Sequence, residues 1–157
     1  IESAALSGRE GAGDKSVLVA WSSALSVGDA EIDQQHRQLI DIINSLHKAM
    51  VAGKARQVIG NLIDRWVEYT VHHFQYEEKR MAACGYPELE KHRREHAEMA
   101  RRVRDLKEKV SGGQGLVELE TRKMLKGWLA EHIKGSDKRY VPYLEQNRSR
   151  VASRDFR

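Results

Sequence analysis

Seven side chains that can bind metal recur along this chain at intervals that fit the faces of four α-helices. They are His36, His73, Glu77, His92, His96, His132 and Asp137. His73 and Glu77 are four residues apart, as are His92 and His96, and residues at i and i+4 share one face of a helix. Each pair can therefore aim at one point inside a helical protein.

The composition of this ligand set indicates two metal ions rather than one. Five imidazoles and two carboxylates exceed the four ligands that zinc normally takes. They fit two six-coordinate ions bridged by the carboxylates, with a solvent-derived oxide or hydroxide as a further bridge. One position then stays open on the ion with fewer protein ligands, and a small molecule can bind there.

Other metal sites fit the sequence less well. A ferritin-like di-iron site needs Glu-x-x-His pairs on two helices, and the nearest candidate, Glu95–Glu98, lacks the histidine. A single zinc ion remains the stronger competitor. His47 and His72 fall outside the expected ligand layer, and we predict that neither binds metal.

Length and charge limit the remaining classes of function. The chain has 157 residues, which suggests one domain, and its net charge is +4. The positive charge is scattered without interleaved aromatic residues, so we expect no nucleic-acid partner.

No apolar run approaches the roughly 20 residues of a membrane helix, and residues 1–16 lack the apolar centre of a signal peptide. The single cysteine, Cys84, fits a reducing compartment, and we predict a cytoplasmic location without membrane contact.

The hydrophobic periodicity predicts an all-α fold, an antiparallel up-down-up-down four-helix bundle with an N-terminal extended arm. Trp21 anchors the arm. The expected segments are a flexible lead or linker at 1–16, an arm at 17–27, helices at 33–51, 57–83, 88–110 and 116–144, and a frayed basic tail at 145–157. The domain itself is expected to span 17–144.

The direction of the helices brings the ligands together. His36 and the pair His92–His96 lie near the starts of the first and third helices, and the other ligands lie near the ends of the second and fourth. In an antiparallel bundle, all of these places fall at one end. His132 and Asp137 are five residues apart rather than four, which predicts a local widening of the helix into a π-type turn.

In these residues and their spacing, the chain resembles the bacterial hemerythrins, which are oxygen-binding non-haem di-iron four-helix bundles. The resemblance covers about residues 17–144 and depends on several motifs. They are Trp21, Ile32-Asp33-Gln34-Gln35-His36-x-x-Leu39, His73-Phe74-x-x-Glu77-Glu78-x-x-Met81, His92-x-x-x-His96, and Trp128-Leu129-x-x-His132-Ile133-x-x-x-Asp137-x-x-Tyr140. All seven ligand positions of the family are filled.

The resemblance implies a division of labour among the ligands. His92, His96 and His132 would hold one iron ion, and His36 and His73 would hold the other. Glu77 and Asp137 would bridge the two non-haem iron ions, together with an oxo or hydroxo group. Dioxygen would bind reversibly at the ion held by His36 and His73, and nitric oxide or azide could take the same place.

The resemblance also implies an apolar oxygen pocket. Its residues would be Leu39, Phe74, Trp128, Leu129 and Ile133. An apolar wall that excludes water slows the loss of the bound oxygen as peroxide. No acid, base or polar substrate pocket is visible in the sequence, so we expect a binding module rather than an enzyme.

The biological role of such a module stays open at this level. A start without methionine and a lead rich in Gly, Ser and Ala favour the oxygen- or redox-sensing domain of a bacterial signalling protein, such as a chemotaxis receptor. The alternatives are a free-standing oxygen carrier or store, and a di-iron enzyme that handles peroxide or nitric oxide.

Overall fold

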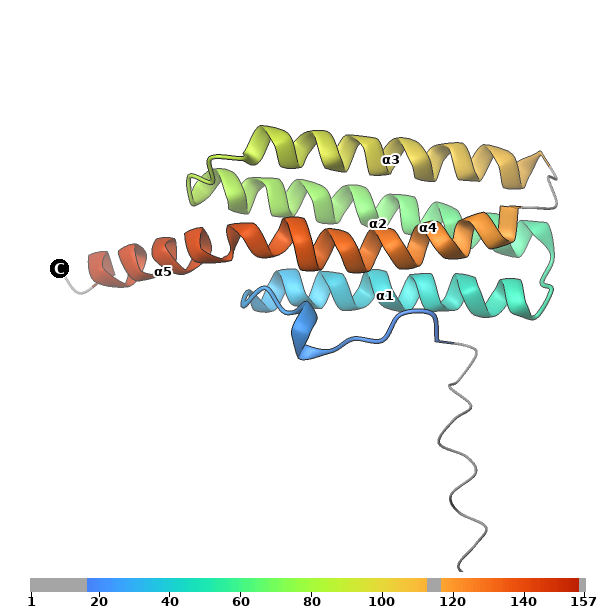
Figure 1. The fold of residues 1–157 in the computed structure, drawn as a ribbon, viewed down its shortest axis with the longest axis horizontal. Coiled ribbons are helices and arrows are strands. Elements are labelled where there is room, and N and C mark those ends of the chain that lie inside the picture. The colour runs from blue at the N-terminus through green and yellow to red at the C-terminus, as the bar shows by residue number, and fades with distance from the viewer. Residues whose placement is uncertain (1–16, 113–116, 156–157) are drawn as a thin grey trace, which may run out of the picture.

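The computed structural model describes residues 17–112 and 117–155, and within them it confirms the all-α four-helix bundle (Figure 1). The main helices are α1 (Ala30–Val51), α2 (Arg56–Ala83), α3 (Leu89–Ser111), α4 (Val117–Glu131) and α5 (Val141–Asp155). Three short elements complete the described chain: the 3₁₀ turn η1 (Ser23–Leu25), the π-helical turn η2 (His132–Ser136) and the 3₁₀ turn η3 (Asp137–Tyr140). The lead predicted at 1–16 lies outside the described residues.

The start of α1 is fixed by its first residues. Gly28 takes a positive φ of 73°, which turns the chain, and Asp29 then caps the helix by accepting hydrogen bonds from the backbone N–H groups of Glu31 and Ile32. Arg80 of α2 donates a hydrogen bond of 2.6 Å to the other oxygen of Asp29. The cap therefore joins the two helices that carry His36 and Glu77.

The fourth helix differs from the prediction in two ways. The expected helix at 116–144 is interrupted by η2 and η3 before α5 continues in nearly the same direction (Figure 1). Residues 145–155, predicted as a frayed tail, instead form the rest of α5. Pro142 does not stop the helix, because it lies in the first turn of α5, where a proline's missing N–H costs nothing.

The buried apolar residues form two clusters. The larger one fills the main length of the bundle and includes Leu39, Ile43, Trp66, Leu129 and Ile133. The smaller one lies toward the end from which α5 projects, and it consists of Val27, Ile32, Met81, Tyr86, Tyr140 and Leu144. Along each helix the predicted ligands fall between residues of the two clusters, so apolar packing encloses the ligand layer on both sides.

The N-terminal arm packs along α1 as predicted. Asn44 accepts hydrogen bonds from the backbone N–H groups of Leu18 and Val19 and donates one to the carbonyl of Val19. The guanidinium of Arg37 lies 4.7 Å from the ring centre of Trp21. Among the described residues, no helix is both long enough and apolar enough to cross a bilayer.

Candidate metal centre

All seven predicted ligands meet in one buried layer. Their ligand atoms form two groups, and within each group the atoms lie within 4.8 Å of one another. One group contains His92, His96 and His132, the other contains His36 and His73, and both include Glu77 and Asp137. The two groups match the division between the two ions that the resemblance implies.

Glu77 divides its two carboxylate oxygens between the groups. Oε1 lies 2.7 Å from Nε2 of His92 and 3.2 Å from Nε2 of His96. Oε2 lies 3.1 Å from Nε2 of His73 and 3.6 Å from Nε2 of His36. The carboxylate is fully buried, so its two oxygens face opposite histidine sets without competition from solvent.

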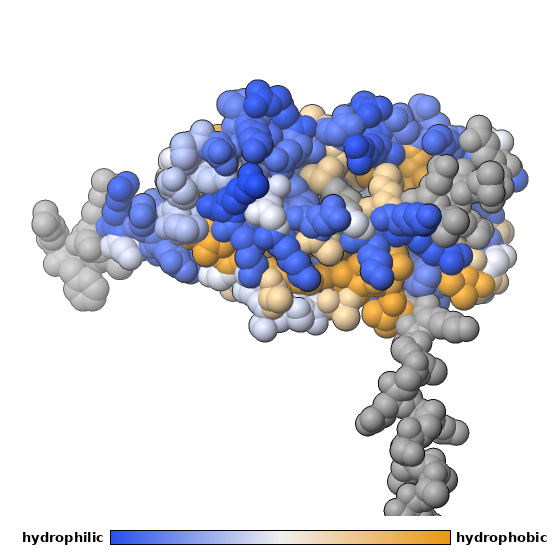
Figure 2. All heavy atoms as spheres, viewed as in Figure 1, coloured by the Kyte–Doolittle hydropathy of each residue, from blue (hydrophilic) through white to orange (hydrophobic). Residues whose placement is uncertain are grey.

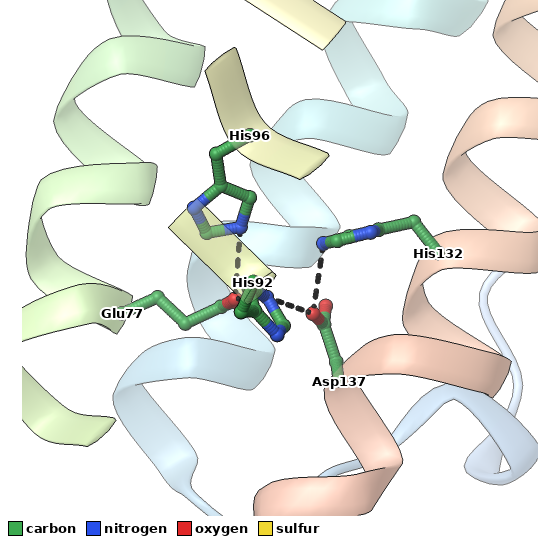
Figure 3. Close-up of side chains that lie close together, drawn as sticks. All are labelled: Glu77, His92, His96, His132 and Asp137. Atoms are coloured by element: carbon green, nitrogen blue, oxygen red, sulfur yellow. Dashed lines mark hydrogen bonds and ion pairs between the residues drawn. The ribbon is translucent and has the colours of Figure 1, made fainter. Parts of the chain in front are cut away.

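Asp137 repeats this division from the other side of the layer. Oδ1 lies 3.0 Å from Nε2 of His132 and 3.1 Å from Nε2 of His92, while Oδ2 lies 3.2 Å from Nε2 of His36. Figure 3 shows His132 and His92 directed at Asp137, and His96 directed at Glu77. Each of the two carboxylates therefore faces both histidine sets.

The local widening of the helix makes the Asp137 contacts possible. As predicted, residues His132–Ser136 form a π-helical turn, followed by a 3₁₀ turn that begins at Asp137. In a regular α-helix, residues five apart diverge by more than a quarter of a turn. The extra residue in the π turn restores a shared direction, and both side chains point into the bundle.

Three further side chains back the histidines, and the sequence did not assign them this role. Oε1 of Gln35 lies 2.8 Å from Nδ1 of His73. Oε1 of Glu78 lies 3.8 Å from Nδ1 of His96, and Oε2 of Glu95 lies 3.6 Å from Nδ1 of His132. In the smaller set, a neutral amide backs His73, whereas two histidines of the larger set lie near carboxylates.

The predicted pocket residues that the structure describes are all buried. Leu39, Leu129 and Ile133 belong to the larger apolar cluster. Phe74 is 6% exposed and stacks on His96 with ring centres 3.8 Å apart and planes 5° from parallel. The side chain of Trp128 lies outside the described part of the chain. Of the two histidines predicted not to bind, His72 is exposed and His47 is buried away from both groups.

The buried carboxylates and histidines of the layer shift one another's pKa values. Burial would lower the pKa of His36, but the neighbouring carboxylates of Asp137 and Glu77 outweigh it and raise the pKa to about 9. The same balance raises the pKa of His92 to about 10. Burial would raise the pKa of Glu77, but the imidazoles of four neighbouring histidines hold that pKa well below its ordinary range. The two carboxylates therefore stay ionised and demand positive charge.

Several atoms at the centre of the layer have no hydrogen-bond partner in the described structure. They are Oε2 of Glu77, both oxygens of Asp137, and Nε2 of His96 and of His132. Buried polar atoms are nearly always satisfied, and buried charges are paired or bound to metal. Two bridged cations satisfy all of these atoms at once, so the donor set fits a di-iron centre.

Comparisons with known proteins agree with this geometry. The sequence profile of the Hemerythrin HHE cation binding domain matches residues 27–144. A bacteriohemerythrin from Stenotrophomonas maltophilia is 36% identical over 135 residues, which are 86% of this chain and 87% of that protein. One from Methylococcus capsulatus is 35% identical over 130 residues, which are 81% of this chain and 97% of that protein.

Solved structures show the same likeness. The crystal structure of wild-type hemerythrin superposes with a TM-score of 0.74 at 33% identity, over 81% of this chain and 98% of that one. A leucine-to-tyrosine mutant of hemerythrin gives a TM-score of 0.75 at 32% identity, over 82% of this chain and 98% of that one.

The fold and the site together define a non-haem di-iron protein built on a four-helix bundle. The profile match and the relatives above place it further: the chain belongs to the hemerythrin family. It is an oxygen-binding di-iron domain, of a family whose members generally bind oxygen rather than catalyse a reaction.

Proposed function

We propose that this chain binds dioxygen reversibly at a di-iron centre held by His36, His73, Glu77, His92, His96, His132 and Asp137. The observation that supports this most is the unequal division of the histidines, three on one side of the bridging carboxylates and two on the other. The ion held by His36 and His73 has fewer protein ligands and keeps a place for a small molecule. Nitric oxide and azide are small enough to compete for that place.

The chain's own residues favour reversible binding over further chemistry. When bound, the two iron ions supply the electrons for oxygen binding. Leu39, Leu129 and Ile133 exclude water from the layer, and exclusion of water slows side reactions. His36 and His73 are 1% and 2% exposed, so solvent does not reach the ion with the open position from their side.

The test is an optical titration combined with metal analysis. Ferrous protein under nitrogen should gain a charge-transfer band in air and lose it again when the gas is purged with nitrogen. Elemental analysis should give two irons per chain, because seven ligands are too many for one ion. A folded protein with a single stable zinc would contradict the proposal. Bleaching with steady consumption of added peroxide, nitric oxide or reductant would favour the enzyme alternative.

We further propose a sensing role as part of a cytoplasmic bacterial signalling protein. The contacts between the arm and α1 support this role. Arg37, the next residue after His36, lies over the ring of Trp21. One turn earlier, Asp33 accepts hydrogen bonds from the backbone N–H of Val27 and the hydroxyl of Ser26. A shift of His36 when oxygen binds would therefore act on both contacts of the arm.

Such coupling requires that the arm's packing differ in free energy between the two iron states. Hydrogen exchange of residues 17–28 should differ between ferrous and oxygenated protein if the arm responds. A Trp21→Ala variant, which lacks the Arg37 contact but keeps the Asp33 contacts, should reduce that difference while oxygen still binds. Equal protection in both states would leave a free-standing carrier or store as the better assignment.

A further inference from the structure

A cleft of about 660 Å³ opens between α3 and α4, next to the metal layer. Its wall includes Lys91, Arg94 and Met99 from α3, Lys123 and Met124 from α4, and His132. Figure 2 shows this face of the molecule, with apolar surface between charged side chains over the two helices. A volume of this size is within the range of about 300–1,000 Å³ that is typical of small-molecule sites.

The cleft carries cations that nothing in the described chain neutralises. Lys91, Arg94 and Lys123 have no ion pair or hydrogen bond to any described residue. The acidic residues of the wall offset part of this charge. Glu98 pairs with Arg101 and Arg102, whereas Glu95 lies 3.6 Å from Nδ1 of His132 and its Oε2 has no hydrogen-bond partner in the described structure. One exposed carboxylate, Glu131, remains. The surplus of cations favours an anionic group, and a phosphate suits Lys and Arg donors.

The rest of the wall suits a flat ring. Met99 is 8% exposed and Met124 is half-buried, and methionine sulfur makes favourable contacts with aromatic rings. Gly127 adds no side chain between them, and a Cβ built there would meet no atom within 4 Å. A planar molecule with a phosphate arm therefore matches both parts of the cleft.

The cleft also reaches the metal layer at its most exposed ligand. His132 is 9% exposed, whereas each of the other six ligands is 3% exposed or less. Its Nε2 faces Asp137, its Nδ1 lies 3.6 Å from Oε2 of Glu95, and the residue borders the cleft beside Glu95. A molecule in the cleft is therefore separated from the di-iron centre by one imidazole, a short path for electrons.

We propose that this cleft binds a reduced flavin nucleotide, which returns oxidised, diferric protein to the ferrous state that binds oxygen. This inference rests on the proposed oxygen-binding function. The flavin hydroquinone anion gives up two electrons and its N5 proton and becomes oxidised flavin. With iron bound, each ferric ion would take one electron and the proton would go to the oxide bridge, so charge and atoms balance.

A flavin fits this task better than a nicotinamide nucleotide of similar charge. The two ferric ions accept one electron each, and a reduced flavin can release its electrons one at a time. A nicotinamide gives both electrons together as a hydride, which needs direct contact with an acceptor atom. The imidazole of His132 offers a path for electrons but no acceptor for a hydride.

The binding test uses the purified diferric protein and flavin mononucleotide, followed by flavin fluorescence. Riboflavin is the matched control ligand, since it has the same ring and lacks the phosphate. We expect flavin mononucleotide to bind at least about tenfold more tightly than riboflavin, because only the former engages the cations. Equal affinity for the two ligands, absence of binding, or tighter binding of NADH would overturn the proposal.

Variants locate the ligand in the cleft. Arg94→Glu combined with Lys123→Glu should weaken flavin mononucleotide binding by about tenfold or more. Reduction of the diferric protein by photoreduced flavin mononucleotide should slow in parallel. Lys54→Glu, an exposed position outside the cleft, should leave binding and reduction unchanged. An effect no larger than that of Lys54→Glu would overturn the proposal.

The optical response to oxygen separates this inference from the oxygen-binding proposal. The double variant should still form the oxygenated spectrum after chemical reduction, because neither residue lies in the metal layer. Failure of the wild-type protein to form that spectrum would count against the proposed function. A normal spectrum with no flavin binding would count against the cleft alone.

Discussion

His73 and Gln35 are joined by a hydrogen bond of 2.8 Å between Nδ1 of the imidazole and the side-chain carbonyl Oε1. Because that oxygen only accepts, the proton lies on Nδ1, and Nε2 is left with its lone pair toward the metal layer. Gln35 is itself held in place, since its amide donates a hydrogen bond of 3.2 Å to Glu31. Through this chain of contacts, α1 supplies one ligand, His36, and orients another on α2.

Removing this support should weaken iron binding at the ion held by two histidines. Partners of ligand histidines typically contribute a factor of about 10–100 in metal affinity, and we expect Gln35→Ala to lose that much. Iron release to a chelator, followed optically, measures the effect. Gln34→Ala changes the exposed neighbour and serves as the control. If both variants released iron at the wild-type rate, the hydrogen bond would have no role in holding the metal.

Replacement of single histidines should reveal the unequal ligand sets. His36→Ala removes one of two histidines from the ion with the open position, so oxygen binding should be lost while the bundle stays folded. His92→Ala should damage assembly more severely, because His92 lies closer to Glu77 and Asp137, at 2.7 Å and 3.1 Å, than His36 does, at 3.6 Å and 3.2 Å. Its loss leaves buried negative charge without a partner, which typically costs about 3–5 kcal/mol.

The two variants are compared by iron content and by urea unfolding. We expect His36→Ala to retain more iron and a higher unfolding midpoint than His92→Ala. His72→Ala, on the exposed face of α2, controls for the loss of an imidazole as such. A wild-type oxygenated spectrum in both ligand variants would rule out the ligand assignment.

The clustering of the seven side chains could be predicted from the sequence because each part of it has a local signal. The pairs four residues apart define a helix face, and the glycines at 53 and 85, both with positive φ, end α1 and α2 and force the neighbours antiparallel. The spacing of five between His132 and Asp137 has only one helical solution, a π turn. Local rules alone therefore bring the seven side chains together in one layer of the bundle.

Features that depend on how helices rotate against one another could not be predicted. Gln35 precedes His36 and lies about 100° away around α1, so only the rotation of α1 against α2 shows that it meets His73. Glu95 and the cleft beside His132 depend in the same way on the packing of α3 against α4. The continuation of α5 beyond residue 144 was missed because residues 145–155 are mostly polar or charged and carry little apolar periodicity.

The cap of α1 should make stability depend on pH. Hydrogen bonds from the backbone and from Arg80 outweigh the effect of burial and hold the pKa of Asp29 below its ordinary value in the folded protein. Because the pKa is lower in the folded protein, the charge of Asp29 stabilises the fold above the ordinary pKa of an aspartate, about 3.9. This contribution is lost as the pH falls through the lower pKa that Asp29 has in the folded protein. Asp29→Asn, which keeps a capping side chain, should therefore be destabilised at neutral pH and approach the wild type below about pH 4.

Urea unfolding of both proteins at neutral and acidic pH gives the comparison, since loss of iron in acid affects both alike. Asp29→Ala should cost about 1 kcal/mol more at neutral pH, because it also removes the cap. A difference between wild type and Asp29→Asn that stays constant with pH would show that the charge of Asp29 contributes nothing to stability.

The apolar wall of the metal layer should control how long the oxygenated protein survives. Ile133 is 1% exposed, follows the ligand His132 in the π turn, and belongs to the larger apolar cluster. Ile133→Glu places a carboxylate there, which draws water toward the layer and offers a new oxygen ligand, so we expect faster autoxidation. Ile133→Val keeps the wall apolar at a cost of about 1 kcal/mol and should autoxidise at close to the wild-type rate. Stopped-flow decay of the oxygenated spectrum measures all three proteins, and equal lifetimes for Ile133→Glu and Ile133→Val would exclude Ile133 from the pocket.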